Sequence, residues 1–286
     1  MLKQYRGYII CVLLMTGALI ASCQPRAPRV QNRQTQLPEA PIPYEMPKTE
    51  ALEHQQVIKH LGYTVGFSTA WNIPYWVAYS LTREETNGTV KRKNSFSPDS
   101  MLKGDHVLHE DYTRSGYDRG HMAPAGDMKW SEQAMEESFY TTNICPQNRN
   151  NNAGDWKDLE ELARDLARAY GEIYICCGPI VTDASRTIGR ERKIVVPQAF
   201  YKVLLRQKDD GSWTSIGFVM PNEAGNRPLM TYMHSVDEVE SITNIDFFYQ
   251  LPDSLEQIVE QDYTISDWTV SPSNNGANSV RVKNRT

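Results

Sequence analysis

The chain has 286 residues, a formal net charge of −5 and a hydrophobic content of 40%. This negative charge argues against a protein that coats nucleic acid by electrostatic attraction, although a local basic site is compatible with it. None of the five cysteines forms a CxxC pair that is followed by a second pair, so zinc ligation by cysteines is disfavoured as well.

The N-terminus has the pattern of a secretory signal. Lys3 and Arg6 precede an apolar run over residues 8–20, which is too short to span a membrane comfortably. The letters IASC, which end at Cys23, resemble a bacterial lipobox. We therefore expect residues 1–23 to be a signal peptide with a lipobox. Cys23 would then carry a lipid that anchors the exported protein to the bacterial envelope, at the outer membrane. An ordinary signal peptide, in which Cys23 is incidental, is the alternative.

Composition separates a folded region from two loose ends. Residues 24–55 begin with a segment that is rich in Pro, Gln and Arg and has no apolar periodicity, which predicts a semi-extended tether. The polar and basic end of the chain, residues 265–286, predicts a flexible tail. Residues 56–264 lie between these ends, and roughly two hundred residues suit one mixed domain with a sizeable core.

The first half of this domain combines short strands with irregular chain. Residues 76–81 alternate aromatic and small side chains, which predicts a strand. An irregular stretch follows over residues 95–111, and residues 117–122 predict a short strand. A helix is predicted to begin at Ser131, which can act as its N-cap. Residues 144–150 then predict a loop or a short strand.

The clearest helix covers residues 158–169, where three leucines form one apolar stripe. Gly171 supplies the expected stop, because glycine is common just beyond the end of a helix. If this helix begins near Asn152, then Asn152 lies at its N-terminal end and Glu160 follows about two turns later.

Apolar strands dominate the remainder of the domain. Turn signals separate them at Gly178-Pro179 and at residues 209–211. The predicted strands are residues 173–177, 193–196, 200–205 and 213–220. The whole pattern predicts an α+β fold with a central, mainly antiparallel sheet that is flanked by helices.

The most informative motif is the run YDRGHMAP at residues 117–124. Arg119 and His121 are two residues apart, so on an extended backbone both side chains point to the same face. The motif therefore places a group that grips phosphate beside one that exchanges protons near neutral pH. For an isolated DRGH tetrapeptide, the better interpretation would be a turn shaped by Asp118 and Gly120 with a structural histidine.

Two downstream runs change that judgement: TNICPQ at residues 142–147 and NAGDWKDLE at residues 152–160. Together with DRGH they resemble the DNA/RNA non-specific endonucleases of the ββα-metal superfamily, which include endonuclease G. The family pattern is DRGH, then N-[IV]-x-P-Q, then N-x-x-x-W with a glutamate one turn after the tryptophan. Every element is present in this order. The resemblance implies a ββα-metal catalytic motif, in which a hairpin precedes the 158–169 helix.

The resemblance also implies a role for each matching residue. His121 is the expected general base that takes a proton from water, and Arg119 is expected to contact the phosphate. The second arginine of the family falls most naturally on Arg92, with either neighbouring lysine as an alternative. Asn143 is expected to orient the histidine or its loop through side-chain hydrogen bonds.

A divalent metal ion is implied by the same resemblance: Mg²⁺ in first place, with Mn²⁺ or another divalent cation as alternatives. Asn152 is the expected direct ligand, because Mg²⁺ keeps several of its waters, and Glu160 would hold the ion through water. Asn150 and Asn151 compete for the ligand position, but Asn152 has the family spacing to the tryptophan. Without the other motifs, Glu160 would be interpreted as a solvent-facing partner of Arg164.

The implied function is hydrolysis of phosphodiester bonds in DNA and RNA, without sequence specificity and with 5′-phosphate ends. The expected partners are both nucleic acids, together with a membrane reached through the lipid on Cys23. The oligomeric state stays open, a homodimer included. The alternative function is a catalytically silent lipoprotein that binds nucleic acid or another partner on the same fold. Every position expected to carry chemistry is filled, which argues against this alternative.

Overall fold

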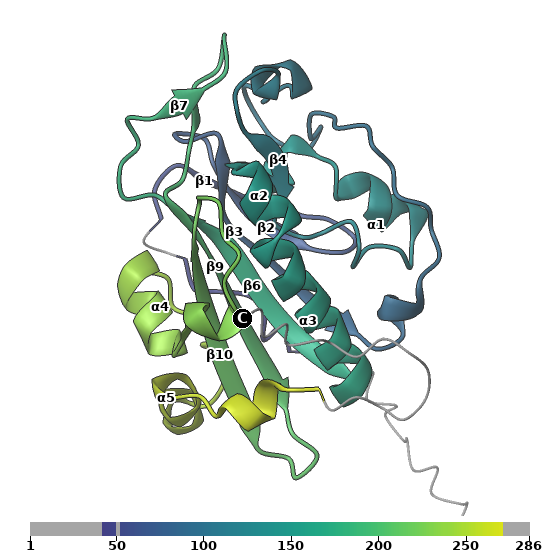
Figure 1. The fold of residues 1–286 in the computed structure, drawn as a ribbon, viewed down its shortest axis with the longest axis vertical. Helices are drawn as coiled ribbons and strands as arrows, with labels where there is room; N and C mark the ends of the chain where they lie inside the picture. Colours follow the sequence, from purple (N-terminus) through teal and green to yellow (C-terminus); the bar gives the residue numbers. More distant parts are fainter. Residues whose placement is uncertain (1–41, 50–51, 271–286) are drawn as a thin grey trace, which may run out of the picture. The chain divides into compact units, whose positions relative to one another are not determined.

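The computed structural model describes residues 42–49 and 52–270 (Figure 1). The predicted signal peptide and lipobox, residues 1–23, lie outside the described residues, as do most of the predicted tether and the end of the predicted tail. Within the described part of the chain, no helix is long and apolar enough to cross a membrane.

One seven-stranded sheet forms the centre of the described chain, and its neighbouring strands are all antiparallel. The strand order is β1-β2-β3-β6-β9-β10-β11 (Figure 1). The bounds are β1 Gln55–Lys59, β2 Thr64–Ser68, β3 Ile73–Thr82, β6 Glu172–Ile180, β9 Ala199–Gln207, β10 Trp213–Pro221 and β11 Met233–His234. The predicted α+β class with a central antiparallel sheet is confirmed.

Successive side chains along a strand point to opposite faces of the sheet. Both faces are buried, each in its own hydrophobic core. On β9, Tyr201 and Val203 point into one hydrophobic core, whereas Phe200 and Leu204 belong to the other. Helix α3 covers the core that contains Phe200, and helices α4 and α5 cover the core on the opposite face (Figure 1). The helices are α1 Glu132–Glu137, α2 Arg149–Ala153, α3 Asp155–Tyr170, α4 Val236–Thr243 and α5 Asp253–Gln261.

Helix α3 begins earlier than predicted and is separated from α2 by Gly154. The predicted range 158–169 lies inside α3, and its C-cap is Gly171 with a φ of +103°, as expected. Gly154 has φ −115° and ψ −111°, which is not helical. A Cβ at this position would lie 2.5 Å from the backbone oxygen of Asn150. Only glycine fits this corner, which turns the chain between the two helices.

Strand β6 is longer than predicted. The sequence predicts a turn at Gly178-Pro179, but both residues lie inside β6 and pair with β9. Pairing with β3 stops at Cys177. From Gly178 onward β6 is therefore hydrogen-bonded to β9 only. A proline is tolerated in a strand that is paired on one side. A Cβ at Gly178 would lie 2.3 Å from the backbone oxygen of Tyr75, so the close approach of β3 requires glycine.

Packed chain extends beyond the predicted domain limits at both ends. Tyr44 packs edge-on against Tyr174, with ring centroids 5.3 Å apart. Near the other end, Trp268 is 2% exposed. Arg206 holds the adjacent backbone, since its Nε donates to the carbonyl oxygen of Asp267 at 3.2 Å. Parts of the segments predicted as tether and tail therefore belong to the folded unit.

Replacing Trp268 tests this packing. Trp268→Ala should lower the free energy of unfolding by about 3 kcal/mol, because truncation of a buried tryptophan leaves a cavity. Ile265→Ala, a change at a side chain that is 48% exposed, should cost less than about 0.5 kcal/mol. Urea denaturation followed by circular dichroism measures both. An unchanged unfolding midpoint for Trp268→Ala would contradict the packing of this segment.

Candidate active site

Two short strands and two helices form the strand–strand–helix unit that the motifs predict. Strand β4 (Asp118–His121) pairs antiparallel with β5 (Ile144–Gln147), and His121 lies opposite Ile144. The connection between these strands contains α1, and α2 and α3 follow β5 directly. The DRGH residues are thus one complete strand of a hairpin, and Asn152 and Glu160 lie on the helices that follow it.

Gly120 allows this hairpin to be tied to α2. A Cβ at Gly120 would lie 2.1 Å from Oε1 of Gln147, so any other residue would displace the glutamine. The Gln147 Nε2 donates to Oδ1 of Asn151 at 2.7 Å. The glycine of the DRGH motif therefore makes room for a hydrogen bond between β5 and α2.

His121 lies in an aromatic pocket at the end of β4. Its ring centroid is 5.4 Å from that of Phe96 and 4.8 Å from that of Phe139. Burial, followed by the positive charge of Arg92, lowers the pKa of His121 to about 3. Its Nε2 is buried and has no hydrogen-bond partner among the described residues. At neutral pH the imidazole is therefore uncharged, and one ring nitrogen makes no bond to the protein.

Arg92 is the cation that acts on both ionisable groups of the site. Its guanidinium carbon lies 5.1 Å from the ring centroid of Phe139, the ring that also contacts His121. Burial lowers the pKa of His121 and raises that of Glu160, and the charge of Arg92 acts on both groups. Lys93, by contrast, pairs with a glutamate of α1 at 2.6 Å. The geometry supports Arg92 over Lys93 as the second arginine.

Arg119 shares a neighbour with His121, as expected for positions two apart on a strand. Its guanidinium carbon lies 5.5 Å from the ring centroid of Phe96, which also contacts His121. Its Nη2 donates to the carbonyl oxygen of His109 at 2.9 Å. Its Nε is buried and finds no hydrogen-bond partner in the described chain. A backbone contact thus holds Arg119 at the site while part of the guanidinium stays uncommitted.

Asn143 fixes the loop after His121 and does not contact the imidazole. Its Oδ1 accepts from the N–H of Ala123 at 2.9 Å, and its Nδ2 donates to the carbonyl oxygen of Ala123 at 2.9 Å and to that of Ser138 at 2.8 Å. The side chain is fully buried. The sequence predicts that Asn143 orients either the histidine or its loop, and its hydrogen bonds go to the loop.

Asn152 reaches β4 from helix α2. Its Nδ2 donates to Oδ2 of Asp118 at 3.3 Å. The Asn152 Oδ1 accepts no hydrogen bond from any described residue, so this oxygen stays available. A neutral amide oxygen beside a carboxylate is a hard-oxygen donor set of the kind that Mg²⁺ prefers. The residues present therefore fit a divalent metal ion at this place. Asn152 and His121 do not touch. Asn152 bonds to Asp118, the first residue of β4, and His121 is the last residue of the same strand.

The competing asparagines are less suited to a metal. Asn151 is 1% exposed and uses both ends of its amide, since Oδ1 accepts from Gln147 and Nδ2 donates to the carbonyl oxygen of Pro221 at 3.2 Å. Asn150 is exposed and receives its contact through the backbone, where its N–H donates to the Asn148 side chain at 2.9 Å. The geometry favours Asn152.

Glu160 is half-buried on α3. Burial raises its pKa to about 7, and the charge of Lys202 is the main opposing influence. The ion pair with Arg164, the alternative considered from the sequence, is not what the structure shows. Arg164 Nη1 instead bonds Oδ1 of Asp127 at 2.7 Å. Glu160 is therefore not bound up in a surface ion pair with Arg164.

Lys202 is a site residue that the motifs do not reveal. It lies on β9 with an exposed fraction of 0%, and its Nζ is 4.8 Å from the ring centroid of Trp156. This Nζ has no hydrogen-bond partner within the described ranges. A lysine inside the apolar run at residues 200–205 is the signal that could have revealed it, because a fully buried lysine is rare without a partner.

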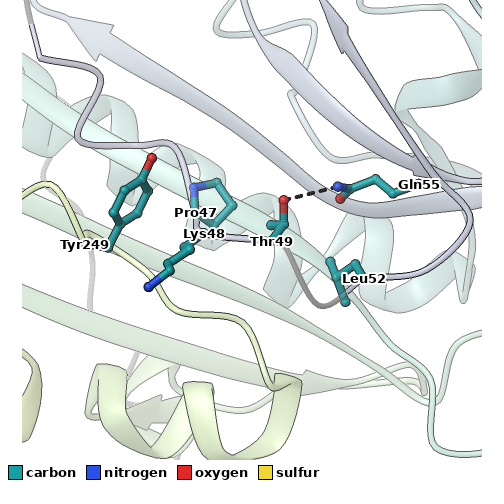
Figure 2. Close-up of a pocket in the computed structure, with 6 residues that line it drawn as sticks. All are labelled: Pro47, Lys48, Thr49, Leu52, Gln55 and Tyr249. Carbon is teal, nitrogen blue, oxygen red and sulfur yellow. Dashed lines mark hydrogen bonds between the residues drawn. The ribbon is translucent and has the colours of Figure 1, made fainter.

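A separate pocket, drawn in Figure 2, contains none of these residues. It is lined by Pro47, Lys48, Thr49, Leu52, Gln55 and Tyr249. Gln55 Nε2 donates to Thr49 Oγ1 at 3.1 Å within this lining (Figure 2). Because its described lining residues include no histidine, cysteine or carboxylate, we assign this pocket no catalytic role.

Comparison with known proteins agrees with this geometry. A family model described as DNA/RNA non-specific endonuclease matches residues 45–254. The chain belongs to the DNA/RNA non-specific endonuclease family. The resemblance predicted from the three motifs is thereby confirmed, and so is the class of enzyme, a nuclease.

Relatives of this endonuclease chain include characterised eukaryotic proteins. It is 34% identical over 263 residues to "Nuclease EXOG, mitochondrial" of Xenopus laevis, covering 86% of the chain and 72% of that protein. It is 30% identical over 185 residues to human "Endonuclease G, mitochondrial", covering 60% of the chain but 62% of that protein, a little under two thirds. A solved EndoG/EndoGI complex superposes with a TM-score of 0.65 at 30% identity, covering 71% of the chain and 89% of that structure.

These relatives correct the predicted location. The Xenopus and human proteins, and those of Schizosaccharomyces pombe and Saccharomyces cerevisiae, are named as mitochondrial nucleases. The prediction of an exported bacterial lipoprotein, anchored to the envelope through Cys23, is therefore wrong. The apolar run and the cysteine that suggested it lie outside the described residues.

The electrostatic role of Arg92 can be measured directly. Arg92→Gln should raise the pKa of His121, because it removes a positive charge that disfavours the protonated imidazole. The pKa should stay below 6.5, since burial is the larger cause of the shift. NMR titration of the ring resonances measures it. Lys91→Gln removes the same charge from an exposed neighbour, and an equal shift in both variants would contradict a specific effect of Arg92.

Proposed function

We propose that the chain hydrolyses phosphodiester bonds in DNA and RNA as a divalent-metal-dependent endonuclease, without sequence specificity and leaving 5′-phosphate ends. The observation that carries this proposal is His121: a buried, uncharged imidazole with an unpartnered Nε2, beside Arg92 and at the end of the strand that Asn152 contacts. Membership of the endonuclease family supports the same activity.

His121 acts as the general base. With a pKa of about 3, its imidazole is unprotonated at neutral pH and can accept a proton from an attacking water. So low a pKa makes a weak base, but an anionic phosphate placed beside the ring would favour the protonated form and raise its proton affinity. Binding of the substrate would therefore prepare His121 for proton transfer.

Arg92 and Arg119 bind the phosphate. Each guanidinium lies against one of the two aromatic rings that hold His121, Arg92 over Phe139 and Arg119 over Phe96. The planar fork of N–H donors matches phosphate oxygens, and the Nε of Arg119 has no protein partner to lose. Contacts to phosphate carry no sequence information, which accounts for the lack of sequence specificity.

Asn152 binds the metal ion directly and Glu160 holds it through water, with Mg²⁺ as the proposed ion. The family depends on a divalent metal. When bound, the ion supplies positive charge beside the phosphate and the departing 3′ oxygen. The pKa of Glu160 is about 7 without a cation, and a neighbouring positive charge would favour its ionised form. Because water attacks directly, the 2′-hydroxyl is not needed, and both DNA and RNA are substrates.

A cleavage assay tests this function. The purified full chain is incubated with plasmid DNA and with RNA in Mg²⁺, with and without EDTA. We expect cleavage of both, abolished by EDTA. His121→Ala should lower turnover by about 10²- to 10⁴-fold, the usual contribution of a general base. His234→Ala, at a histidine that pairs with Glu238 on α4, should cleave like the wild type. Absence of metal-dependent cleavage would favour the alternative, a catalytically silent binding protein on the same fold.

The metal ligand has its own test. Asn152→Ala should raise the Mg²⁺ concentration for half-maximal cleavage by at least about tenfold, because a donor to the ion is lost. Asn150→Ala, at an exposed position of the same helix, should leave that concentration unchanged. A reversed result, with the effect in Asn150→Ala alone, would transfer the ligand role to Asn150.

A further inference from the structure

Three carboxylates meet between α4 and α5, which lie side by side on the face of the sheet opposite α3 (Figure 1). Asp237 and Glu240 are one turn apart on α4, and Glu260 lies near the end of α5. One oxygen from each of these side chains lies within 4.8 Å of the other two. We call this group the α4/α5 carboxylate cluster.

Glu260 is the unusual member of the cluster. It is 4% exposed, and its Oε1 has no hydrogen-bond partner in the described chain. Only two residues of α5 are buried, Val259 and Glu260, so half of the buried positions of this helix hold a carboxylate. Buried polar atoms in proteins are nearly always hydrogen-bonded. Glu260 is therefore a buried carboxylate that lies beside two others and has one oxygen without the partner that buried polar atoms normally have.

No protein cation fills this need within the described ranges. The ion pairs found there leave out Asp237, Glu240 and Glu260; Lys48 pairs with Asp246 at 3.7 Å, and both side chains of that pair are exposed. Burial, and then neighbouring carboxylates, raise the pKa of Glu260 to about 9. The charged groups that act most strongly on Glu260 are carboxylates, and no ion pair in the described ranges supplies a cation to the cluster.

We propose that the α4/α5 carboxylate cluster binds a divalent cation of the size of Ca²⁺. The donors are all oxygens, which selects a hard cation and disfavours zinc and copper. Calcium–oxygen distances imply that ligands on opposite sides of the ion are up to about 4.6–5.2 Å apart, against about 4.0–4.2 Å for Mg²⁺. The cluster oxygens all lie within 4.8 Å of one another, inside the span of a calcium shell. Asp237 is exposed, so water can complete the coordination.

The cation joins α4 to α5 and gives the buried end of α5 its missing counter-charge. Glu240 is already positioned for this, because its Oε1 accepts from the backbone N–H of Phe247 at 2.7 Å. Ser215 of β10 donates to the carbonyl oxygen of Val259 at 2.7 Å, which sets the position of the residue next to Glu260. The site is structural and is separated by the sheet from the endonuclease site, on which it does not depend.

Calorimetric titration of the chelator-treated full chain with CaCl₂ tests the proposal. The Asn152→Ala variant is used, so that the proposed nuclease metal does not contribute. We expect one Ca²⁺ site, weakened by more than about tenfold in Glu260→Gln, because a charged ligand is lost. Asp237→Asn, at an exposed position, should weaken it as well without endangering the fold. Asp253→Asn removes the same charge from α5 outside the cluster and should leave the affinity unchanged.

Thermal unfolding supplies the second readout. Ca²⁺ should raise the unfolding temperature of the parent and of Asp253→Asn, because a ligand that binds the folded state stabilises it. At the same Ca²⁺ concentration it should raise the unfolding temperature of Glu260→Gln and Asp237→Asn less, because these variants bind the ion more weakly. The proposal is overturned if the parent shows neither heat of binding nor a rise in unfolding temperature with Ca²⁺, which would leave Glu260 as a protonated buried acid. It is also overturned if both cluster variants bind Ca²⁺ like the parent.

Discussion

The burial of an uncharged histidine between two phenylalanine rings is the constraint on which the site depends. Phe96 and Phe139 both pack against the His121 ring, and burial is the main cause of its low pKa. Asn143 fixes the loop that leaves this pocket, and Gly120 allows the hairpin to bind α2. Together these contacts fix the surroundings of His121, whose Nε2 has no hydrogen-bond partner among the described residues.

The pKa values of His121 and Glu160, two groups on which the charge of Arg92 acts, shift in opposite directions. The low pKa of His121 keeps its imidazole unprotonated, and the pKa of Glu160 rises to about 7. Both shifts favour the uncharged form of the group. Sites in which environments push pKa values apart are typical of acid–base chemistry. Lys202, buried under α3, limits the rise at Glu160. In the proposed function, a phosphate beside His121 and a cation beside Glu160 would each favour the charged form of its neighbour.

Features that depend on neighbouring residues in the chain could be predicted from the sequence. Features that depend on packing between distant segments could not. The helix over residues 158–169 and its stop at Gly171 follow from periodicity and backbone freedom, and the structure has both. Phe96 lies in irregular chain, and Lys202 enters the site only because β9 runs beneath α3. The apolar run around Lys202 signals that the lysine is buried, but no local pattern tells what either residue packs against. The error in the predicted location has another origin, since targeting segments are recognised by cellular machinery and not through packing.

A local group of cations at the hairpin explains how an acidic chain can act on a polyanion. With a net charge of −5, the molecule as a whole repels nucleic acid. Arg92 and Arg119 nevertheless gather at the hairpin, on the α3 side, while the carboxylate cluster lies under α4 and α5 on the opposite face. Sheets and their covering helices are each about 10 Å thick, comparable to the distance over which salt screens charge. A phosphate at the hairpin therefore meets the two guanidinium groups at short range, while charges on the opposite face are screened by salt.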